Sequence, residues 1–329
     1  MTQLSERAKI LVVDDEPANL KVIREVLAND YRLSFAKSGE LALQLIENEP
    51  PKLILLDIMM PDMSGFEVCK VLKANPKTAH IPVIFVTALS HEQDESEGFA
   101  LGAVDYITKQ ISPAIVRARV KNHLSLVQAE QLQLAHIDLI QRLGRAAEYK
   151  DTDTGEHIAR MSRYSKVLAL AYGMSEYEAE QLKQAAPMHD VGKIGIPDAV
   201  LLKPGRLNEN EYEHMKQHAL IGAKILENSP SPLLQLAHKL ALEHHEKWDG
   251  TGYPYGLKGK EISIEGRIVA IADVFDALTS KRPYKKAWSI EEALDLLKDE
   301  AGKHFDPQLV DLFIGQIDSI IEIKNTYTS

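Results

Sequence analysis

The sequence predicts a doubly wound α/β domain with a five-stranded parallel sheet, joined by a long helix to an all-α domain. Three observations lead to this prediction. Short apolar runs alternate with helical patterns in the first 110 residues, a breaker-free stretch follows, and helical patterns fill the rest of the chain. A length of 329 residues also suits two domains better than one. We expect the first domain over residues 1–111, a helical linker over 112–147 and the second domain over 148–329.

The first domain is predicted to repeat a strand followed by a helix. The expected strands are Ile10–Val13, Leu33–Phe35, Leu53–Leu56, Val83–Val86 and Tyr106–Ile107. The expected helices between them are Asn19–Ala28, Glu40–Glu49, Phe66–Lys73 and Glu92–Ala100. This order favours a parallel sheet with right-handed crossovers and helices on both faces.

The segment between the domains is expected to form one long helix. After Pro113 the next strong breaker is Gly144, and apolar residues recur at spacings close to three and four from Val116 to Ile140. Such a stripe serves either packing on its own domain or a dimerising coiled coil, although only part of it keeps strict heptads. We expect the coiled coil, and hence a homodimer.

The second domain is predicted to be almost wholly helical. The expected helices are Gly155–Tyr172, Ser175–His189, Glu209–Glu227, Pro232–His245, Ile264–Leu278, Ile290–Glu300 and Pro307–Ile321. The segment Trp248–Ile264 is rich in glycine and is expected to be a loop.

Composition bounds the location and the partners of the protein. The net charge of −10 argues against nucleic acid polymers as partners, but not against a small anionic substrate held by metals and local cations. The first residues lack the apolar segment of a secretion signal, and no apolar run reaches the roughly 18–20 residues of a membrane helix. The single cysteine, Cys69, suits a reducing compartment. We expect a cytoplasmic protein that does not enter a membrane.

Three aspartates stand at the ends of two predicted strands. Asp14 and Asp15 follow the first strand, and Asp57 follows the third. In a flavodoxin-like strand order these strands are neighbours at the point where ligands of open parallel sheets bind. Three converging carboxylates require a cation, and oxygen ligands favour Mg²⁺. A lone aspartate there more often caps a helix or begins a turn, but Thr87 and Lys109 also follow strands, which favours a common site.

These residues carry a resemblance to a known family. The matching motifs are Leu11-Val-Val-Asp-Asp-Glu16, Asp57-Ile-Met-Met-Pro-Asp62, Ser64-Gly65, Thr87-Ala88 and Lys109. Residues 8–123 resemble a CheY-like receiver domain of two-component signalling. The resemblance implies that Asp57 accepts a phosphoryl group from a histidine kinase. It also implies a site completed by Mg²⁺ on Asp14, Asp15 and Asp57 and by the switch residues Thr87, Tyr106 and Lys109.

One position departs from the pattern of receiver domains. The family usually places a proline after the lysine, joined by a cis bond, whereas Gln110 follows Lys109 here. A cis bond before glutamine would cost about 3 kcal/mol or more. The sequence therefore does not fix the position of Lys109.

The second half of the chain holds most of the histidines. Eight of twelve lie beyond residue 150, and the pairs His189-Asp190 and His244-His245 stand out. The other candidates are His157, four residues after Asp153, together with His218, Asp273 and Asp276. A buried carboxylate has to be paired or metal-bound, and imidazole with carboxylate suits Fe, Mn, Zn or Ni. Adjacent donors on a helix diverge by about 100°, so we expect two or more ions with Asp190 as a bridge.

Each histidine taken alone has an ordinary explanation. A lone histidine such as His218 is more often packed or solvated than a ligand. We leave His214, His238 and His304 without a functional role for this reason. The joint occurrence of the other donors is what favours a metal site.

The second half also resembles a known family. The matching motifs are Asp153-Thr-Gly-Glu-His157, Met188-His-Asp-Val-Gly-Lys-Ile-Gly-Ile-Pro197, His244-His-Glu246, Asp249-Gly-Thr-Gly-Tyr-Pro254, Ile268-Val-Ala-Ile-Ala-Asp273 and Arg282-Pro-Tyr-Lys285. Residues 145–325 resemble an HD-GYP phosphodiesterase domain, a metal-dependent hydrolase that converts cyclic di-GMP to pGpG and on to GMP.

This resemblance implies a set of metal ligands. They are His157, His189, Asp190, His218, His244, His245 and Asp273, with Asp153 at the position of a further acidic ligand. Members with three metals tend to have glutamate there, so the shorter Asp153 favours two ions. The resemblance and the donor set together favour Fe or Mn, with Ni or Zn as alternatives.

The resemblance assigns the remaining site residues as well. Lys193 would contact the scissile phosphate or the hydroxide, and Asp276 would lie behind a ligand or protonate the leaving oxygen. Arg282 and Lys285 would hold substrate phosphate, although such a basic patch is ordinarily solvated. Tyr253, in the Gly252-Tyr253-Pro254 loop, would contact substrate or a diguanylate cyclase.

Two alternatives to this function remain open in the sequence. The enzyme could act on another cyclic dinucleotide, such as cyclic GMP-AMP. The helical half could also be a scaffold that binds a cyclic dinucleotide or a cyclase without turnover, although the complete ligand set argues against this. In every case we expect the helix over 112–147 to transmit the phosphorylation state of Asp57.

Overall fold

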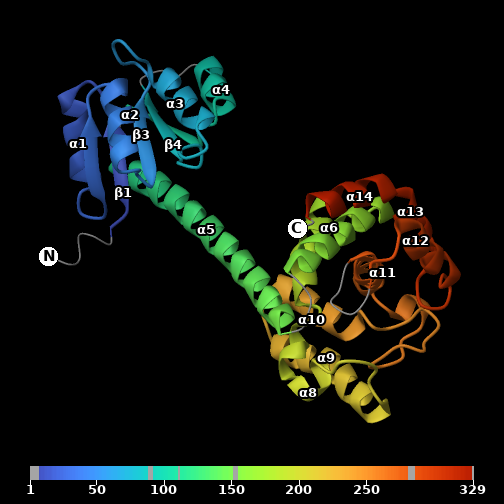
Figure 1. The fold of residues 1–329 in the computed structure, drawn as a ribbon. Coiled ribbons are helices and arrows are strands. Elements are labelled where there is room, and N and C mark those ends of the chain that lie inside the picture. Colours follow the sequence, from blue (N-terminus) through green and yellow to red (C-terminus); the bar gives the residue numbers. More distant parts are fainter. Residues whose placement is uncertain (1–6, 88–91, 110–111, 151–154, 281–285, 328–329) are drawn as a thin grey trace. The chain divides into compact units, whose positions relative to one another are not determined.

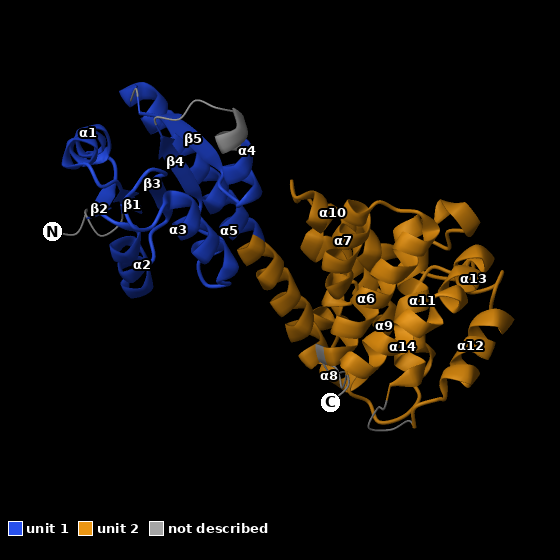
Figure 2. Ribbon diagram, turned by 90° about the horizontal axis from the view of Figure 1, so that it is seen from above, with its two compact units in different colours: residues 1–133 blue, residues 134–329 orange. Residues whose placement is uncertain are grey.

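The computed structural model describes residues 7–87, 92–109, 112–150, 155–280 and 286–327 (Figure 1). The chain divides into two compact units, Met1–Gln133 and Leu134–Ser329 (Figure 2). Within the described ranges, no helix is both long enough and apolar enough to cross a membrane.

The first unit contains the predicted five-stranded parallel sheet. Its strands are β1 (Lys9–Val13), β2 (Arg32–Ala36), β3 (Leu53–Asp57), β4 (Val83–Thr87) and β5 (Asp105–Thr108), in the order β2-β1-β3-β4-β5. The intervening helices are α1 (Pro17–Leu27), α2 (Gly39–Asn48), α3 (Gly65–Ala74) and α4 (Glu92–Ala100). The prediction of a doubly wound sheet is confirmed, since every neighbouring pair of strands is parallel.

Alternating side chains of the buried strands form two cores. Ile10 and Val12 of β1 face α1 and the start of α5, whereas Leu11 and Val13 face α2 and α3. Side chains alternate between the two faces of a strand, so a run of apolar residues serves both layers of helices. The sheet is thereby buried on both faces, and only its strand ends and edges are left for chemistry.

A single helix, α5 (Pro113–Tyr149), contributes to both units. The single long helix predicted over 112–147 is therefore confirmed. Val116 and Val120 of its first turns belong to the core of the first unit. Ile140 and Ala147 of its last turns belong to the core of the second.

The second unit is helical, as predicted. Its elements are α6 (Gly155–Tyr172), α7 (Glu176–Ala185), η1 (Ala186–Met188), η2 (Val191–Gly195), α8 (Asp198–Leu201), α9 (Glu209–Leu226), α10 (Pro232–Glu243), η3 (Gly259–Glu261), α11 (Ile264–Thr279), α12 (Ile290–Asp299), α13 (Pro307–Gly315) and α14 (Ile317–Thr326). Tyr164 of α6 and Phe313 of α13 pack against Phe275 of α11, with ring centroids 5.8 and 5.0 Å apart. This aromatic group places α6 and α11 side by side.

Two predicted helices end earlier than expected. The helix expected over Ser175–His189 ends at Ala185 and passes into the short 3₁₀ turn η1, which contains Pro187. Proline lacks the N–H that an α-helix interior needs, so the chain turns here. The helix expected over Pro307–Ile321 is divided after Gly315, a residue with low helix propensity.

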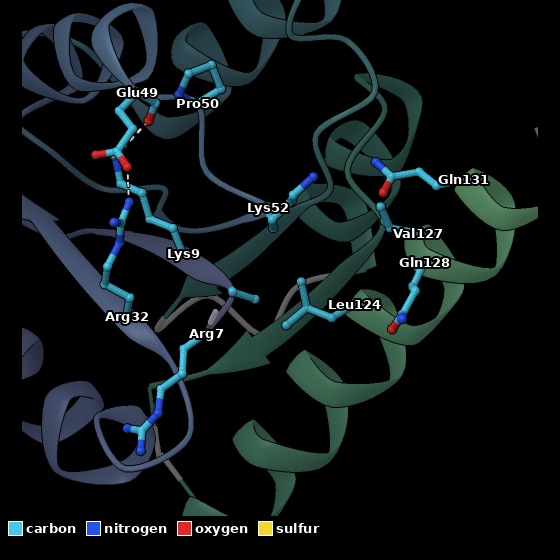
Figure 3. A pocket seen from close by; sticks show the side chains of 11 residues that line it. Arg7, Lys9, Arg32, Glu49, Pro50, Lys52, Leu124, Val127, Gln128 and Gln131 are labelled. Atoms are coloured by element: carbon cyan, nitrogen blue, oxygen red, sulfur yellow. Dashed lines mark hydrogen bonds and ion pairs between the residues drawn. The ribbon is translucent and has the colours of Figure 1, made fainter. Parts of the chain in front are cut away.

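A cavity of about 550 Å³ opens at the amino-terminal ends of the strands (Figure 3). Lys9, Arg32 and Lys52 stand at or next to the starts of β1, β2 and β3, and Glu49 pairs with the first two. The strands are parallel, so the aspartates at the carboxyl ends of β1 and β3 lie at the opposite edge of the sheet. This cavity is therefore separate from the candidate phosphorylation site.

Candidate metal centre and phosphoacceptor site

The pairing of the strands aligns the acidic residues of the first unit. Val13 of β1 pairs with Leu56 of β3, so Asp14 and Asp57 are the next residues on neighbouring strands. One ligand oxygen from each of Asp14, Asp15 and Asp57 lies within 4.8 Å of the others. The sheet therefore gathers three carboxylates that can hold one divalent ion.

Lys109 reaches this cluster although no proline follows it. Its Nζ lies 2.6 Å from Oδ2 of Asp57 and 3.2 Å from Oδ2 of Asp14. Its backbone N–H donates to the carbonyl of Thr87, which fixes the start of the loop. Gln110 itself lies outside the described residues.

Asp57 is fully buried, and burial raises the pKa of its carboxyl despite the hydrogen bond from Lys109. Thr87 is buried at the end of β4, one residue beyond the partner of Asp57 in the sheet. Tyr106 is also buried, and its ring packs against Phe85 and Phe99. The structure thus buries the three side chains that the sequence proposes as phosphoacceptor and switch residues.

The second unit brings its histidines and aspartates into two adjoining groups. His157, His189 and Asp273 form one group, in which one ligand atom of each lies within 4.8 Å of the others. Asp190, His218, His244 and His245 form the other by the same measure. We call the two groups together the cage. All seven residues named as metal ligands by the sequence belong to it.

Local structure explains how adjacent residues serve both groups. His189 and Asp190 stand between η1 and η2, where the chain leaves the α-helical path. Gly192 allows η2 to approach α9 closely, because a Cβ there would lie 1.9 Å from the carbonyl oxygen of His218. The turn therefore lies directly on the helix that carries His218.

The tautomers of the histidines leave acceptor atoms facing one another. The Nδ1 atoms of His189, His218 and His244 lie 2.7–2.9 Å from the backbone carbonyls of Ala186, Met215 and Leu240. A carbonyl only accepts, so each Nδ1 carries the hydrogen and each Nε2 of a neutral ring is an acceptor.

These acceptor atoms converge on a carboxylate. The Nε2 atoms of His218 and His244 lie 3.2 and 3.5 Å from Oδ1 of Asp190, and Nε2 of His189 lies 3.3 Å from Oδ2. Among the described residues, neither His189 Nε2 nor Asp190 Oδ1 has a hydrogen-bond partner. Buried acceptors that face buried acceptors require protons or metal ions between them, so the donor set fits a metal centre.

The pKa shifts differ between the two groups of the cage. Burial alone would lower the pKa of His157, but hydrogen bonds to Asp273 and Asp276 raise it well above its usual value. Burial likewise opposes ionisation of Asp190, but Lys193 and His189 hold its pKa well below the usual range. Burial lowers the pKa of His244 and His245, which keeps these rings in the neutral form that binds metal.

Asp276 lies behind the cage. Its Oδ2 is 2.8 Å from Nδ1 of His157, and both its oxygens accept from the guanidinium of Arg160 at 2.7 and 2.8 Å. A carboxylate that holds the rear nitrogen of a ligand histidine fixes the orientation of the ring. The alternative role, protonation of a leaving oxygen, does not fit, because Asp276 is fully buried and both oxygens are engaged.

Tyr253 stands at the rim of the second group. Its ring lies over that of His245, with centroids 4.7 Å apart and planes inclined by 30°. Lys216 lies over the same ring, with its Nζ 5.6 Å from the centroid. Lys193 lies in η2, with its Nζ 2.8 Å from Oδ2 of Asp190.

Some predicted residues lie outside the part of the chain that the structure describes. These are Asp153, Arg282 and Lys285. Two residues of the site were not predicted from the sequence, namely Arg160 and Glu148. Glu148 lies eight residues after Ile140 and four after Gly144, on the same face of the helix as the apolar stripe. A charged residue on this buried face was the sequence signal that could have identified it.

The chain matches two known protein families. Residues 10–121 match the response regulator receiver domain, and residues 141–309 match the HD domain. The second match covers half of the chain.

Curated relatives share both parts. A protein of Vibrio cholerae named "Probable cyclic di-GMP phosphodiesterase" is 40% identical, over 99% of this chain and 81% of its own length. The "Cyclic di-GMP phosphodiesterase response regulator RpfG" of Xanthomonas campestris is 39% identical, over 93% of this chain and 86% of its own.

A third relative matches the helical half. The "3'3'-cGAMP-specific phosphodiesterase 2" of Vibrio cholerae is 46% identical, over 57% of this chain and 36% of its own length. With relatives of this identity over nearly the whole chain, the protein belongs to the family of response regulators that join a receiver domain to an HD domain.

Proposed function

We propose that this protein is a response regulator in which phosphorylation of Asp57 controls the metal-dependent hydrolysis of cyclic di-GMP to pGpG and GMP. The observation that carries the proposal is the cage, in which Nε2 atoms of three histidines face the carboxylate of Asp190 without hydrogens to share. The names of the relatives that align with nearly the whole chain support cyclic di-GMP as substrate.

The cage is proposed to hold two transition-metal ions. One would be held by His157, His189 and Asp273, and the other by the group of Asp190 and three histidines. Asp190 would bridge them, since its two oxygens face different histidines. Nitrogen and oxygen donors without thiolate favour Fe or Mn, with Ni or Zn as alternatives. When bound, such a pair supplies a water of lowered pKa and neutralises charge on a phosphoryl group.

The protein's own residues would bind and orient the phosphodiester. Lys193 is proposed to pair with a phosphoryl oxygen at the edge of the cage, where its Nζ already lies near Asp190. Asp276 would keep His157 oriented through its Nδ1. Arg282 and Lys285 are proposed from the sequence to hold substrate phosphate, and Asp153 to be a further acidic ligand. Tyr253 would contact the substrate or, with its loop, a diguanylate cyclase.

The receiver domain is proposed to control this activity. A histidine kinase would transfer a phosphoryl group to Asp57, with Mg²⁺ on Asp14, Asp15 and Asp57. Helix α5 would transmit the change, because it contributes to the cores of both units. Exposed leucines on its middle turns, including Leu126, Leu132 and Leu139, support a homodimer through this helix. We also propose a cytoplasmic location, because the single cysteine suits a reducing compartment and the proposed partner is a histidine kinase.

A second substrate has specific support. The relative named for 3'3'-cGAMP aligns with the helical half at higher identity than the two full-length relatives, although over a shorter stretch. A scaffold that binds without turnover is the third possibility, and the intact cage argues against it.

Turnover by the full-length protein tests these possibilities together. Protein purified without oxygen and loaded with Mn²⁺ or Fe²⁺ is incubated with cyclic di-GMP or cyclic GMP-AMP, with and without beryllofluoride as acyl-phosphate mimic. We expect pGpG and GMP from cyclic di-GMP, at a rate that beryllofluoride changes. A preference for cyclic GMP-AMP would support the second substrate. If neither nucleotide gives product, only the non-catalytic scaffold remains as an explanation.

A further inference from the structure

Glu148 is a buried carboxylate next to the cage that the proposed function does not use. It is 2% exposed, and its Oε1 lies 3.6 Å from Nε2 of His157. Its Oε2 is buried and accepts no hydrogen bond from any residue that the structure describes.

Another buried glutamate of the same domain has both carboxylate oxygens hydrogen-bonded by the backbone. Glu246 is also 2% exposed, but its Oε1 accepts from the backbone N–H of Tyr255 at 2.7 Å and its Oε2 from that of Leu257 at 2.9 Å. Burial of a charged group without such partners is costly, because the lost hydration is not replaced. Glu148 therefore has the burial of a structural residue without the hydrogen bonds of one.

The side of His157 that Glu148 faces is the side that binds metal. Nδ1 of His157 is engaged by Asp276, so Nε2 is the atom left for an ion. Oδ1 of Asp273 lies 3.3 Å from the same Nε2. Two donors at about 2.0–2.2 Å from one ion lie at most roughly 4.4 Å apart. The separation of 3.6 Å between Glu148 and His157 therefore allows both to bind the same ion.

The end of α5 holds Glu148 firmly in this place. At Gly144 a Cβ would lie 2.4 Å from the carbonyl oxygen of Pro187, so the helix lies directly on the turn before His189. Nζ of Lys150 donates to the carbonyls of Ile194 and Ile196, at 3.0 and 2.7 Å, on the other side of that turn. The last turns of α5 are thus bound to the segment that carries His189 and Asp190.

We propose that the carboxylate of Glu148 is a further ligand of the ion held by His157, His189 and Asp273. It adds a negatively charged oxygen to a group that otherwise has two imidazoles and one carboxylate. It also makes the last turn of α5 part of the metal centre. The proposal rests on the proposed function only in requiring that the cage binds metal ions.

The test is a Mn²⁺ titration of metal-free, full-length protein. Excess Mg²⁺ occupies the receiver site, and free Mn²⁺ is followed by its paramagnetic resonance signal. The variants are Glu148→Gln, His157→Gln as a positive control and Glu243→Gln as a matched control. Glu243 is a half-buried glutamate whose carboxylate accepts from the backbone of Ser263. Asp153→Asn is measured beside them, because the sequence proposed that residue as the extra acidic ligand.

We expect wild-type protein and Glu243→Gln to bind two ions alike. Glu148→Gln should bind one of the two ions about 10–100-fold more weakly, in the step that His157→Gln also weakens. Affinities within twofold of wild type for Glu148→Gln, or a loss confined to Asp153→Asn, would overturn the proposal.

A second variant covers the case in which Glu148→Gln does not fold. Glu148→Asp keeps the charge but withdraws the oxygens by about 1.5 Å, one carbon–carbon bond. It is expected to weaken the same ion about tenfold, and unchanged Mn²⁺ affinity would again overturn the proposal. Wild-type protein that binds two ions but does not hydrolyse cyclic di-GMP would contradict the proposed function, and leave the assignment of Glu148 to be decided by these affinities.

Discussion

The receiver domain and the HD domain both gather carboxylates, but they offset the negative charge in different ways. In the receiver, Lys109 places its ammonium 2.6 Å from Asp57 and 3.2 Å from Asp14, so the chain itself supplies a cation. In the HD domain, imidazole acceptors face Asp190 and Asp273, and their own hydrogens point away to carbonyls or to Asp276.

This difference indicates how each site uses its ion. An all-oxygen cluster with its own lysine suits a hard ion that can exchange as the phosphoryl group comes and goes. A cage of buried nitrogen and oxygen acceptors requires resident ions, because unsatisfied buried acceptors are costly. The receiver site is therefore suited to switching, and the cage to catalysis by bound metal.

The largest effect is expected when a residue of one site is changed and both sites are measured. Asp190→Asn changes a carboxylate that faces histidines of both groups of the cage. We expect hydrolysis of cyclic di-GMP to fall by more than the 10–100-fold typical of residues behind a metal ligand. Metal content by emission spectroscopy should fall in parallel, while acyl-phosphate formation on Asp57 stays as in wild type.

The reciprocal change is Asp57→Asn. This variant should form no acyl phosphate with a small phosphodonor, because the acceptor oxygen is gone. The cage should still bind both ions, since strand β3 carries none of its ligands. Gel mobility of the phosphorylated form and metal content measure the two effects. A loss of metal from this variant would mean that the two sites are not independent in the way the comparison assumes.

A change behind the cage should have an intermediate effect. Arg160→Ala leaves the fully buried Asp276 without the guanidinium that pairs with both its oxygens. Removing one partner of a buried ion pair costs about 3–5 kcal/mol, and a residue behind a ligand affects metal affinity about 10–100-fold. Urea unfolding and Mn²⁺ titration measure the two quantities.

The matched control for this variant lies on the same helix. Arg163 packs its guanidinium over the ring of Tyr327 and donates to a backbone carbonyl of its own helix. Arg163→Ala should therefore cost much less stability and leave metal affinity unchanged. Equal effects of the two substitutions would mean that the role of Arg160 is only general packing.

The smallest expected effect concerns a histidine outside the cage. Burial, aided by the charge of Lys247, lowers the pKa of His304 from 6.5 to about 4. Between about pH 4 and 6.5 the unfolded chain binds a proton there that the folded chain does not. Stability contributed by His304 is therefore complete above pH 6.5 and decreases as the pH falls through that window.

This pH dependence is measured by unfolding His304→Gln and wild type in urea at pH 7 and pH 5. The wild type should lose more stability between the two values than the variant does. A resonance of the His304 ring that titrates near 6.5 would contradict the expectation. The result would separate a histidine held neutral by burial and a nearby lysine from the histidines of the cage.

Several features of the two sites could be predicted from residue order alone. Asp14 and Asp57 were expected together because neighbouring parallel strands end at the same edge of a sheet. The seven cage residues were named as ligands through the family resemblance, and the fold brings them together. The helix expected through His189 was wrong at its end, because Pro187 introduces a turn that the apolar spacing did not reveal.

Residue order was enough to locate most strands and helices, the long helix between the domains and the chemical types gathered in each site, because apolar periodicity within an element is a local property. The tertiary structure decided that Lys109 reaches Asp57, that Arg160 pairs with Asp276 and that Glu148 faces the cage. Arg160 and Asp276 are 116 residues apart in the chain. Contacts of this kind depend on how whole helices pack, and helix packing is set by side chains far apart in the sequence.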